Sequence, residues 1–196
     1  EIRLSLVGSE MCIRDRTTEQ YLDAYRSILN TMVEGMTSAE LSDSISYNFI
    51  VQMIPHHRAA IEMSENVLKY ITDDSLREIA SRIITEQTQS INDMERIESS
   101  CSELVDSRSD LIRYQRAVNR ILRVMFYNMR HAYTTDRIEC DFMREMIPHH
   151  MGAVEMGTNA LRFPICTELQ PIIESIIVSQ KRGIAQMEAL LKQLRC

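Results

Sequence analysis

The sequence contains no tryptophan, only five glycines and four prolines in 196 residues, and 6% aromatic residues. β-Sandwiches and barrels need frequent turn residues and aromatic-rich strands, so this composition argues against them. No run approaches the roughly 18 to 20 apolar residues that a membrane-spanning helix requires. The net charge of −6 disfavours nucleic acid as a partner, because phosphate binding needs clustered lysine and arginine. The composition therefore predicts a folded protein that is not built from β-sheets.

Residues 1–16 differ in character from the rest of the chain. They show no sustained helical period and resemble translated adapter sequence, so we interpret them as a non-native segment. They also lack the basic start, the apolar run and the small-residue cleavage site of a signal peptide. This favours a cytoplasmic location, with secretion as the alternative, because the native start of the protein can be missing.

The cysteines follow no zinc-binding spacing, and no Cys-x-x-Cys occurs. Cys140 and Cys166 are expected at opposite ends of one helix, about 39 Å apart at 1.5 Å per residue, so they cannot pair with each other. Cys140 can reach Cys196 if the three helices run up, down and up. The simpler interpretation is reduced thiols at the ends of helices, and the cysteines leave the compartment open.

The chain contains two copies of one segment at an offset of 93 positions. The offset holds without a gap from Ile28 and Ile121 to Glu95 and Glu188, and about 26 of some 70 aligned positions are identical. Both copies contain the pentapeptide Met-Ile-Pro-His-His. Such self-similarity indicates a duplication.

Each copy is predicted to form three amphipathic helices, because its apolar residues recur every three or four positions. Each such unit has a wide apolar face, so we expect the two units to pack about a pseudo-twofold axis into one all-α bundle. Capping boxes at Thr17–Gln20 and Thr167–Gln170 mark two of the helix starts. The first repeat, 17–105, is predicted to contain helices over about 18–36, 44–71 and 75–100, and the second repeat, 106–196, to contain helices that begin near Arg108, near Asp136 and after Thr167.

The histidine pair of each copy lies in the core-facing region of the second predicted helix. Pro55 and Pro148 stand directly before the pairs, where proline removes a backbone hydrogen bond and disfavours helical geometry at the preceding residue. Because the apolar register survives on both sides, we predict a kinked but continuous helix. The alternative is a break, with the proline at the first position of a new helix.

Adjacent imidazoles among methionines favour a transition-metal site. Neutral imidazole binds copper, zinc, nickel and iron, and thioether sulfur adds a preference for soft Cu(I). Burial favours the neutral, ligating form of histidine. Two glutamines interrupt the apolar stripe of the third helices, and we expect their amides to hydrogen-bond the histidine rings and fix the tautomer. The candidate metal ligands are His56, His57, His149, His150, Met53, Met63, Met146, Met156, Met32, Met36, Met125 and Met129, and the supporting amides are Gln87 and Gln180.

Simpler interpretations apply to several of these side chains. Methionine at core spacing is often only a flexible filler, which is how we interpret Met94 and Met187, and it stays an alternative for the methionines of the first helices. Glu62 and Glu155 lie at surface angles and are expected to be solvated, with a carboxylate ligand as the alternative. His131 has no histidine counterpart and is predicted to be peripheral.

The repeated signature is Phe-x3-Met-Ile-Pro-His-His-x2-Ala-(Ile or Val)-x-Met, starting at Phe49 and Phe142, followed by Gln-x3-Ile-x2-Met. It resembles the family called domain of unknown function 305, over nearly everything from Thr17 to Cys196, as two family domains. The resemblance implies a ferritin-like, four-helix-bundle type of fold. Some relatives are implicated in copper binding and resistance, which implies the four histidines and nearby methionines as ligands. Asp141 fits the acidic residue often found before the motif, where the first copy has Asn48, so the first copy is expected to differ in affinity or to serve as a scaffold.

We therefore predict a metal-binding helical protein without enzymatic activity, with copper as the metal and copper binding, buffering or tolerance as the function. The first alternative is a structural or partner-binding module whose histidine pairs are hydrogen-bonded internally. The second is a ferritin-like di-iron protein, but such bundles use Glu-x-x-His pairs and none occurs here. A homo-oligomer is compatible with the sequence.

Overall fold

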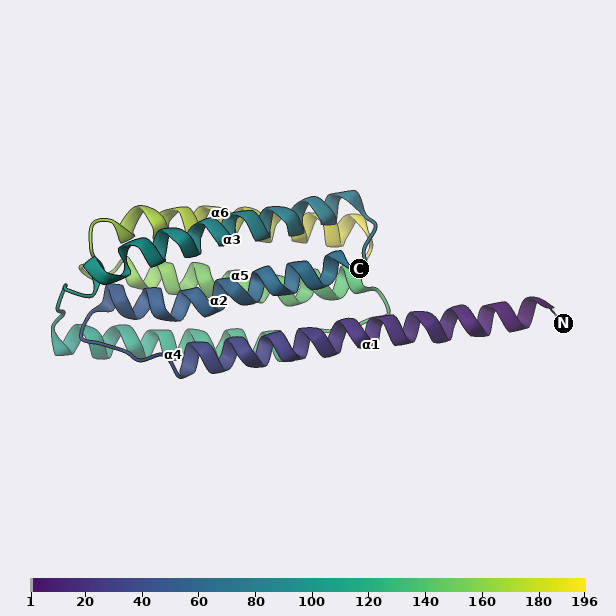
Figure 1. The fold of residues 1–196 in the computed structure, drawn as a ribbon, viewed down its shortest axis with the longest axis horizontal. Coiled ribbons are helices and arrows are strands. Elements are labelled where there is room, and N and C mark those ends of the chain that lie inside the picture. Colours follow the sequence, from purple (N-terminus) through teal and green to yellow (C-terminus); the bar gives the residue numbers. More distant parts are fainter. Residues whose placement is uncertain (1) are drawn as a thin grey trace.

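The helices of the protein are stacked in three layers of two. The computed structural model describes the backbone of residues 2–196 and the side chains of residues 16–196. Equivalent helices of the two repeats share a layer (Figure 1), and the middle layer, α2 with α5, is covered on both sides. The described residues form six helices and no strand: α1 (Ile2–Thr37), α2 (Ile45–Leu68), α3 (Asp74–Cys101), α4 (Arg108–Arg130), α5 (Ile138–Ala160) and α6 (Leu169–Gln193).

The two halves repeat the same internal contacts. Asn66 of α2 donates from Nδ2 to the carbonyl of Tyr21 at 3.1 Å, and Asn159 of α5 donates to the carbonyl of Tyr114 at 3.3 Å. Both pairs are related by the offset of 93. The predicted all-α fold, with three helices from each repeat, is confirmed. None of the described helices combines the length and the apolarity needed to span a bilayer.

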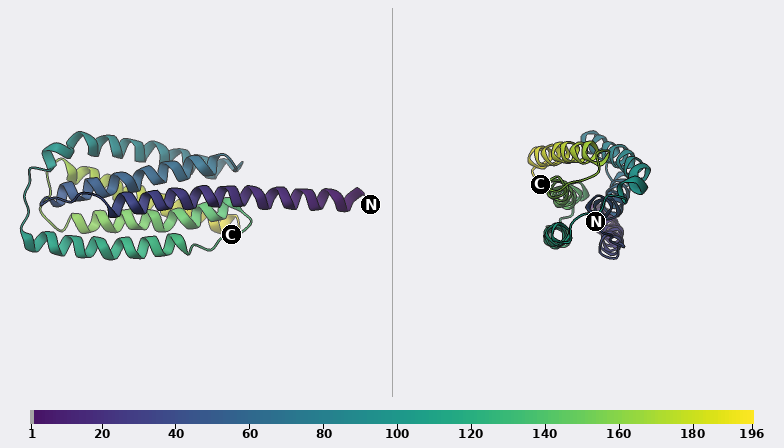
Figure 2. Two further views of the ribbon diagram at one scale, coloured as in Figure 1. Left: turned by 60° about the horizontal axis from the view of Figure 1, so that its bottom comes forward. Right: turned by 90° about the vertical axis from the view of Figure 1, so that its left-hand side faces the viewer.

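Five of the six helix starts agree with the sequence prediction to within two residues, and the start of the first helix, assigned from a capping box, is wrong. Helix α1 runs straight through Thr17–Gln20 and begins at Ile2. Its first turns project beyond the other helices (Figure 2), so there is nothing there to select an apolar stripe. Whether residues 1–16 are foreign stays a prediction, since the side chains of residues 1–15 lie outside the described part. Helix α6 begins two residues after Thr167, with no side-chain cap.

Both proline-containing helices are continuous. Helix α2 passes through Pro55 and helix α5 through Pro148 without interruption, so the alternative of a break is wrong. The Ser44 hydroxyl caps α2 by accepting from the Tyr47 amide at 3.3 Å. Gly35 of α1 lies against Pro55, where a Cβ would come within 2.9 Å of the proline Cβ. The glycine therefore lets α1 approach α2 at the turn that precedes the histidine pair.

Four cysteines form two disulfides, so the interpretation as reduced thiols is wrong. Cys101 pairs with Cys166 and Cys140 pairs with Cys196, with Cα–Cα distances of 5.5 and 5.6 Å. The second pairing is the one that an up, down and up arrangement allows. The first joins the end of α3 to the segment before α6, and thus one repeat to the other.

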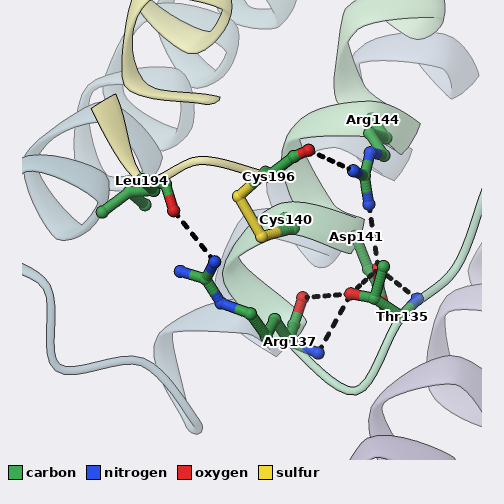
Figure 3. Close-up of a disulfide and its surroundings, with 7 residues drawn as sticks. All are labelled: Thr135, Arg137, Cys140, Asp141, Arg144, Leu194 and Cys196. Atoms are coloured by element: carbon green, nitrogen blue, oxygen red, sulfur yellow. Dashed lines mark hydrogen bonds and ion pairs between the residues drawn. A yellow bond between two sulfur atoms is a disulfide. The ribbon is translucent and has the colours of Figure 1, made fainter. Parts of the chain in front are cut away.

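The disulfide of Cys196 belongs to a small polar cluster that fixes the last residues of the chain (Figure 3). Arg137 donates to the carbonyl of Leu194 at 2.9 Å, and Arg144 donates to the carbonyl of Cys196 at 2.8 Å. The last turn after α6 is therefore held against the start of α5 by a covalent bond and two charge-assisted hydrogen bonds.

Candidate metal centre

The structure brings the four predicted histidines together at the centre of the molecule. They lie on α2 and α5, the two helices of the middle layer, and none exposes more than 2% of its surface. The buried position follows from the sequence, because His56 and His149 continue the apolar stripes of their helices. The pairs meet because α2 and α5 pack against each other.

His56 and His149, which we call the inner pair, stack on each other. Their ring centroids are 3.6 Å apart and their planes are inclined by 26°. Nε2 of His56 lies 3.1 Å from the carbonyl oxygen of His149, and Nε2 of His149 lies 3.0 Å from the carbonyl oxygen of His56. A carbonyl oxygen only accepts, so each Nε2 carries the proton and each neutral ring has its lone pair on Nδ1.

His57 and His150, which we call the outer pair, line a cavity of about 630 Å³ between α3 and α6. We call it the α3–α6 cavity. Nε2 of His57 lies 3.1 Å from the hydroxyl oxygen of Ser90. No described residue hydrogen-bonds the ring of His150, which packs against Gly183. The outer pair is thus closed in by protein but borders a space large enough for an ion and water.

All four Nδ1 atoms are buried and have no hydrogen-bond partner among the described residues. A buried acceptor without a partner lowers the stability of the fold by about 1–3 kcal/mol, so each such atom calls for a structural or functional explanation. Metal-ligating histidines typically donate their second ring N–H to a carbonyl or another acceptor, which fixes the tautomer and aims the free lone pair at the metal. The inner pair shows this arrangement of the second ring nitrogen, and its two Nδ1 atoms have no partner among the described residues.

The histidines are held in the form that binds metals. Burial lowers the pKa of all four rings, to about 3 for His57 and about 4 for His149. Neighbouring imidazoles lower the pKa of His56, His57 and His150 further, because two charged rings would repel each other. Near neutral pH the rings are therefore uncharged, and no proton has to leave before a metal binds.

The eight candidate methionines all lie in the core. They come from the outer helices α1 and α4 and from the middle helices α2 and α5, and none exposes more than 2% of its surface. Met125 packs directly on Gly152, where any Cβ would overlap its sulfur. Among the described residues, no three His, Cys, Asp or Glu side chains are grouped to hold a metal ion. A metal at the imidazoles would therefore need other ligand atoms, such as thioether sulfur.

The predicted hydrogen bonds from glutamine to the histidine rings are wrong. Nε2 and Oε1 of Gln87, and Oε1 of Gln180, are buried without a partner. Both side chains border the α3–α6 cavity beside the outer pair instead. Backbone carbonyls and Ser90 take the place that we assigned to the amides. Ser90 lies three residues after Gln87, on the same face of α3, and this spacing could have identified it.

Asn48 and Asp141 have the same structural role in the two halves. Oδ1 of Asn48 accepts from the Ser42 amide, and Oδ1 of Asp141 accepts from the Thr135 amide, each at 2.8 Å. Both side chains therefore hold the segment before the second helix of their repeat. The expected difference in affinity between the copies finds no support in these contacts.

Three residues predicted to be peripheral or solvated lie on the surface. Glu62 and Glu155 are exposed on α2 and α5, and His131 is exposed at the end of α4. His131 stacks on Tyr127 with the ring centroids 4.1 Å apart, and its Nδ1 lies 2.8 Å from the Tyr127 carbonyl. None of them borders the outer pair.

A buried carboxyl group one turn before His149 was not predicted from the sequence. Glu145 exposes 2% of its surface and accepts a hydrogen bond of 2.5 Å from the hydroxyl of Tyr21 on α1. Burial raises the pKa of Glu145 to about 8. The equivalent residue in the first repeat is Gln52, whose amide donates to the carbonyl of Met36 at 3.3 Å. The spacing of four from His149 could have placed this carboxyl in the core.

We predict that Glu145→Gln makes the protein more stable at alkaline pH. The folded protein keeps this proton up to about pH 8, whereas the unfolded chain loses it near the ordinary pKa of 4.5. Stability of the wild type should therefore fall as the pH rises from about 4.5 to about 8. The variant should match the wild type at pH 5 and exceed it at pH 9 by an amount on the order of 2 kcal/mol, because local rearrangement hydrates part of the charge. Urea unfolding at both pH values measures the difference.

The matched control is Glu155→Gln, which changes an exposed carboxyl on the same helix. It should leave the dependence of the urea midpoint on pH as in the wild type. Parallel curves for the wild type and Glu145→Gln from pH 5 to pH 9 would show that Glu145 is ionised in the folded protein.

Comparison with known proteins places this arrangement in a family. The model of the domain of unknown function DUF305 matches residues 16–98 and 46–191. Among solved structures, CopM in the apo form is 28% identical, with 76% of this chain and 96% of that chain covered and a TM-score of 0.57. CopM in the Cu(I)-bound form is 25% identical, with 79% and 99% covered and a TM-score of 0.57.

CopM has also been solved in Ag-bound and Cu(II)-bound forms. A DUF305 fragment from Deinococcus radiodurans is 22% identical, with 76% of this chain and 96% of that chain covered and a TM-score of 0.55, and it supports the fold alone. A search of curated proteins found no match to the chain. The family match spans both histidine pairs and all but the ends of the sequence, so this protein belongs to the DUF305 family.

Proposed function

We propose that this protein binds copper, as Cu(I), between its buried imidazoles and the methionine sulfur atoms of the core. The observation that carries the proposal is the set of four buried imidazoles whose Nδ1 atoms have no hydrogen-bond partner among the described residues. Two of them belong to rings whose other nitrogen donates to a carbonyl, as in histidines that bind metals. Binding, buffering or tolerance of copper is the function that follows.

The surroundings favour a soft cation over a hard one. Thioether sulfur and neutral imidazole are the ligands that Cu(I) prefers, whereas hard cations prefer carboxylates. The similar CopM structures hold Cu(I), Cu(II) and Ag, which supports a soft or borderline metal here. The proposed ligands are His56, His57, His149 and His150, with Met53, Met63, Met146, Met156, Met32, Met36, Met125 and Met129 as the sulfur donors, and with Gln87 and Gln180 beside the outer pair.

A purely structural role is the second candidate, and the inner pair favours it. Each inner ring is stacked and makes one hydrogen bond within the core, as that role requires. A purely structural role does not explain the unpartnered Nδ1 atoms, however. It also gives no function to the α3–α6 cavity beside the outer pair. A di-iron protein is not supported, because the described residues offer no cluster of carboxylates and histidines.

Titration of the metal-free protein with Ag⁺ tests the proposal, because Ag⁺ is a soft, redox-stable substitute for Cu(I) and needs no reductant that would open the disulfides. A ligand that binds only the folded state stabilises it by about 2.7 kcal/mol at a hundredfold excess over Kd. For a chain of this size we expect the Tm to rise by roughly 5–10 °C. Zn²⁺ should have a smaller effect, since thioethers are poor ligands for it.

The variant His57→Gln with His150→Gln should lose most of the rise in Tm, because two of the proposed ligands are gone. His131→Gln changes an exposed histidine and is the matched control, which should respond as the wild type does. A melting curve that does not move in saturating Ag⁺ and Cu(I) would rule out the proposed function and leave the structural role.

We also propose that the protein works in an oxidising compartment. Two disulfides join its helices, and such bonds persist outside the reducing cytosol. This differs from the cytoplasmic location expected from the sequence, which rested on the lack of a recognisable signal peptide. Thiol labelling of the protein in its own cells, with and without prior reduction, tests it.

A further inference from the structure

We propose that the two outer imidazoles are unequal ligands: Gly183 leaves His150 open to a soft metal ion in the α3–α6 cavity, whereas Ser90 occupies His57. The inference rests on the proposed function and adds an order of loading to it. It follows from one pair of positions, Ser90 and Gly183, which the offset of 93 relates to each other. The metal ion should therefore contact His150 first.

The cavity gives the ion a place beside both rings. It lies between α3 and α6, measures about 630 Å³ and is bordered by His57 and His150. Its charged lining residues are three carboxylates and one arginine, namely Glu86, Asp93, Glu174 and Arg182. Glu86 pairs with Arg182 and Asp93 pairs with Arg96, so Glu174 is the lining carboxylate without an ion pair among the described residues. Its charge favours a cation in the cavity. Gln87 and Gln180, whose amides have buried atoms without a partner, border the same cavity.

Ser90 engages the first outer ring. Its hydroxyl oxygen lies 3.1 Å from Nε2 of His57. A hydroxyl can donate or accept, so this hydrogen bond satisfies Nε2 in either tautomer. A metal ion that approaches Nε2 from the cavity has to break the bond and displace the hydroxyl. His57 is therefore held in place, with only its buried Nδ1 unused.

Gly183 leaves the second outer ring without such a contact. A Cβ at position 183 would lie 2.9 Å from both Cδ2 and Nε2 of His150, closer than real Cβ atoms come to other atoms. Any side chain here would push the ring out of its position. Glycine thus provides the space in which the ring sits, and no described group hydrogen-bonds Nε2. This nitrogen is the one that a metal ion can reach without breaking a protein hydrogen bond.

Ring nitrogen NMR tests the order of loading. The ¹⁵N signals of both outer rings are assigned with His57→Gln and His150→Gln, and the metal-free protein is titrated with Ag⁺. We expect the His150 signals to move first, below one equivalent, and the His57 signals to follow. Ser90→Ala removes the hydroxyl, so His57 should then respond together with His150. In the metal-free state the same variant should shift Nε2 of His57 and leave His150 unchanged.

Gly183→Ala supplies the opposite change. The added methyl group displaces the His150 ring, and we expect its response to require at least tenfold more Ag⁺ while circular dichroism confirms that the protein is folded. If this variant does not fold, Ser90→Ala alone decides the question. Simultaneous movement of both rings in the wild type, or movement of His57 first, would overturn the inference while leaving metal binding intact. No movement of any ring at saturating Ag⁺ would overturn both the inference and the proposed function.

Discussion

The variant in which Cys101 and Cys166 are both replaced by alanine is expected to lose about 4 kcal/mol of unfolding free energy. The disulfide joins residues 65 positions apart, and a cross-link of that span removes much of the conformational freedom of the unfolded chain. It also connects the end of α3 in the first repeat to the segment before α6 in the second. Alanine suits the test because Cys101 is fully buried, and serine would leave an unpaired hydroxyl there.

Urea unfolding followed by circular dichroism measures this loss. The comparison is the variant with Cys140 and Cys196 replaced by alanine, which opens a span of 56 positions inside the second repeat. Chain entropy predicts nearly the same loss for it, also about 4 kcal/mol. A change below about 1 kcal/mol in the Cys101 and Cys166 variant would contradict the expectation and would mean that packing alone joins the two ends.

Replacing His56 by alanine is expected to destabilise the protein by about 3–5 kcal/mol. The ring is fully buried, so its removal leaves a cavity at the contact between α2 and α5. It also removes the hydrogen bond to the His149 carbonyl and the surface on which the His149 ring stacks. His149→Ala should have an effect of similar size, because the contacts are reciprocal.

A double-mutant cycle shows whether the two rings act as a pair. Stacked partners that bond each other's backbone should be non-additive, so the double variant should lose about 1–2 kcal/mol less than the sum of the single variants. His131→Ala is the control, and it should change stability by no more than about 0.5 kcal/mol because the ring is exposed. Strict additivity would mean that each inner ring stabilises only its own helix.

The fold could be read from the sequence because apolar spacing and burial agree along most of the chain. Helices α2 and α5 follow their stripes through Pro55 and Pro148, and the spacing of these stripes by itself predicts that His56 and His149 lie in the core. The start of the first helix was predicted wrongly because the apolar spacing is missing there. Its first turns project beyond the other helices, and the sequence of residues 1–16 shows no sustained helical period.

The hydrogen-bond partners of the histidine rings could not be predicted from the apolar spacing. A stripe indicates which side of a helix is buried, but not which atom on the opposite helix it meets. The inner rings donate to backbone carbonyls. Every residue has a carbonyl, so no residue type in the sequence indicates this contact. Gln87 was the more obvious partner for His57, yet the shorter side chain of Ser90 makes the hydrogen bond.

The pairing of Cys101 with Cys166 could not be predicted from the sequence, for a different reason. Geometry within one repeat limits which cysteines can meet there, as it did for Cys140 and Cys196. The relative placement of the two repeats is set only when α2 packs on α5 and α3 on α6. A link between the repeats therefore depends on a packing arrangement that no local pattern contains.

The presence of both repeats in one chain has a further consequence. In a dimer of identical subunits, every substitution appears twice and both must be tolerated at the axis. Here one chain supplies both halves, so Glu145 can face Tyr21 while the equivalent Gln52 bonds a carbonyl. The two repeats can therefore carry different side chains at equivalent positions of the same fold. The covalent joining of two similar halves is thus what allows a symmetric fold to hold an asymmetric interior.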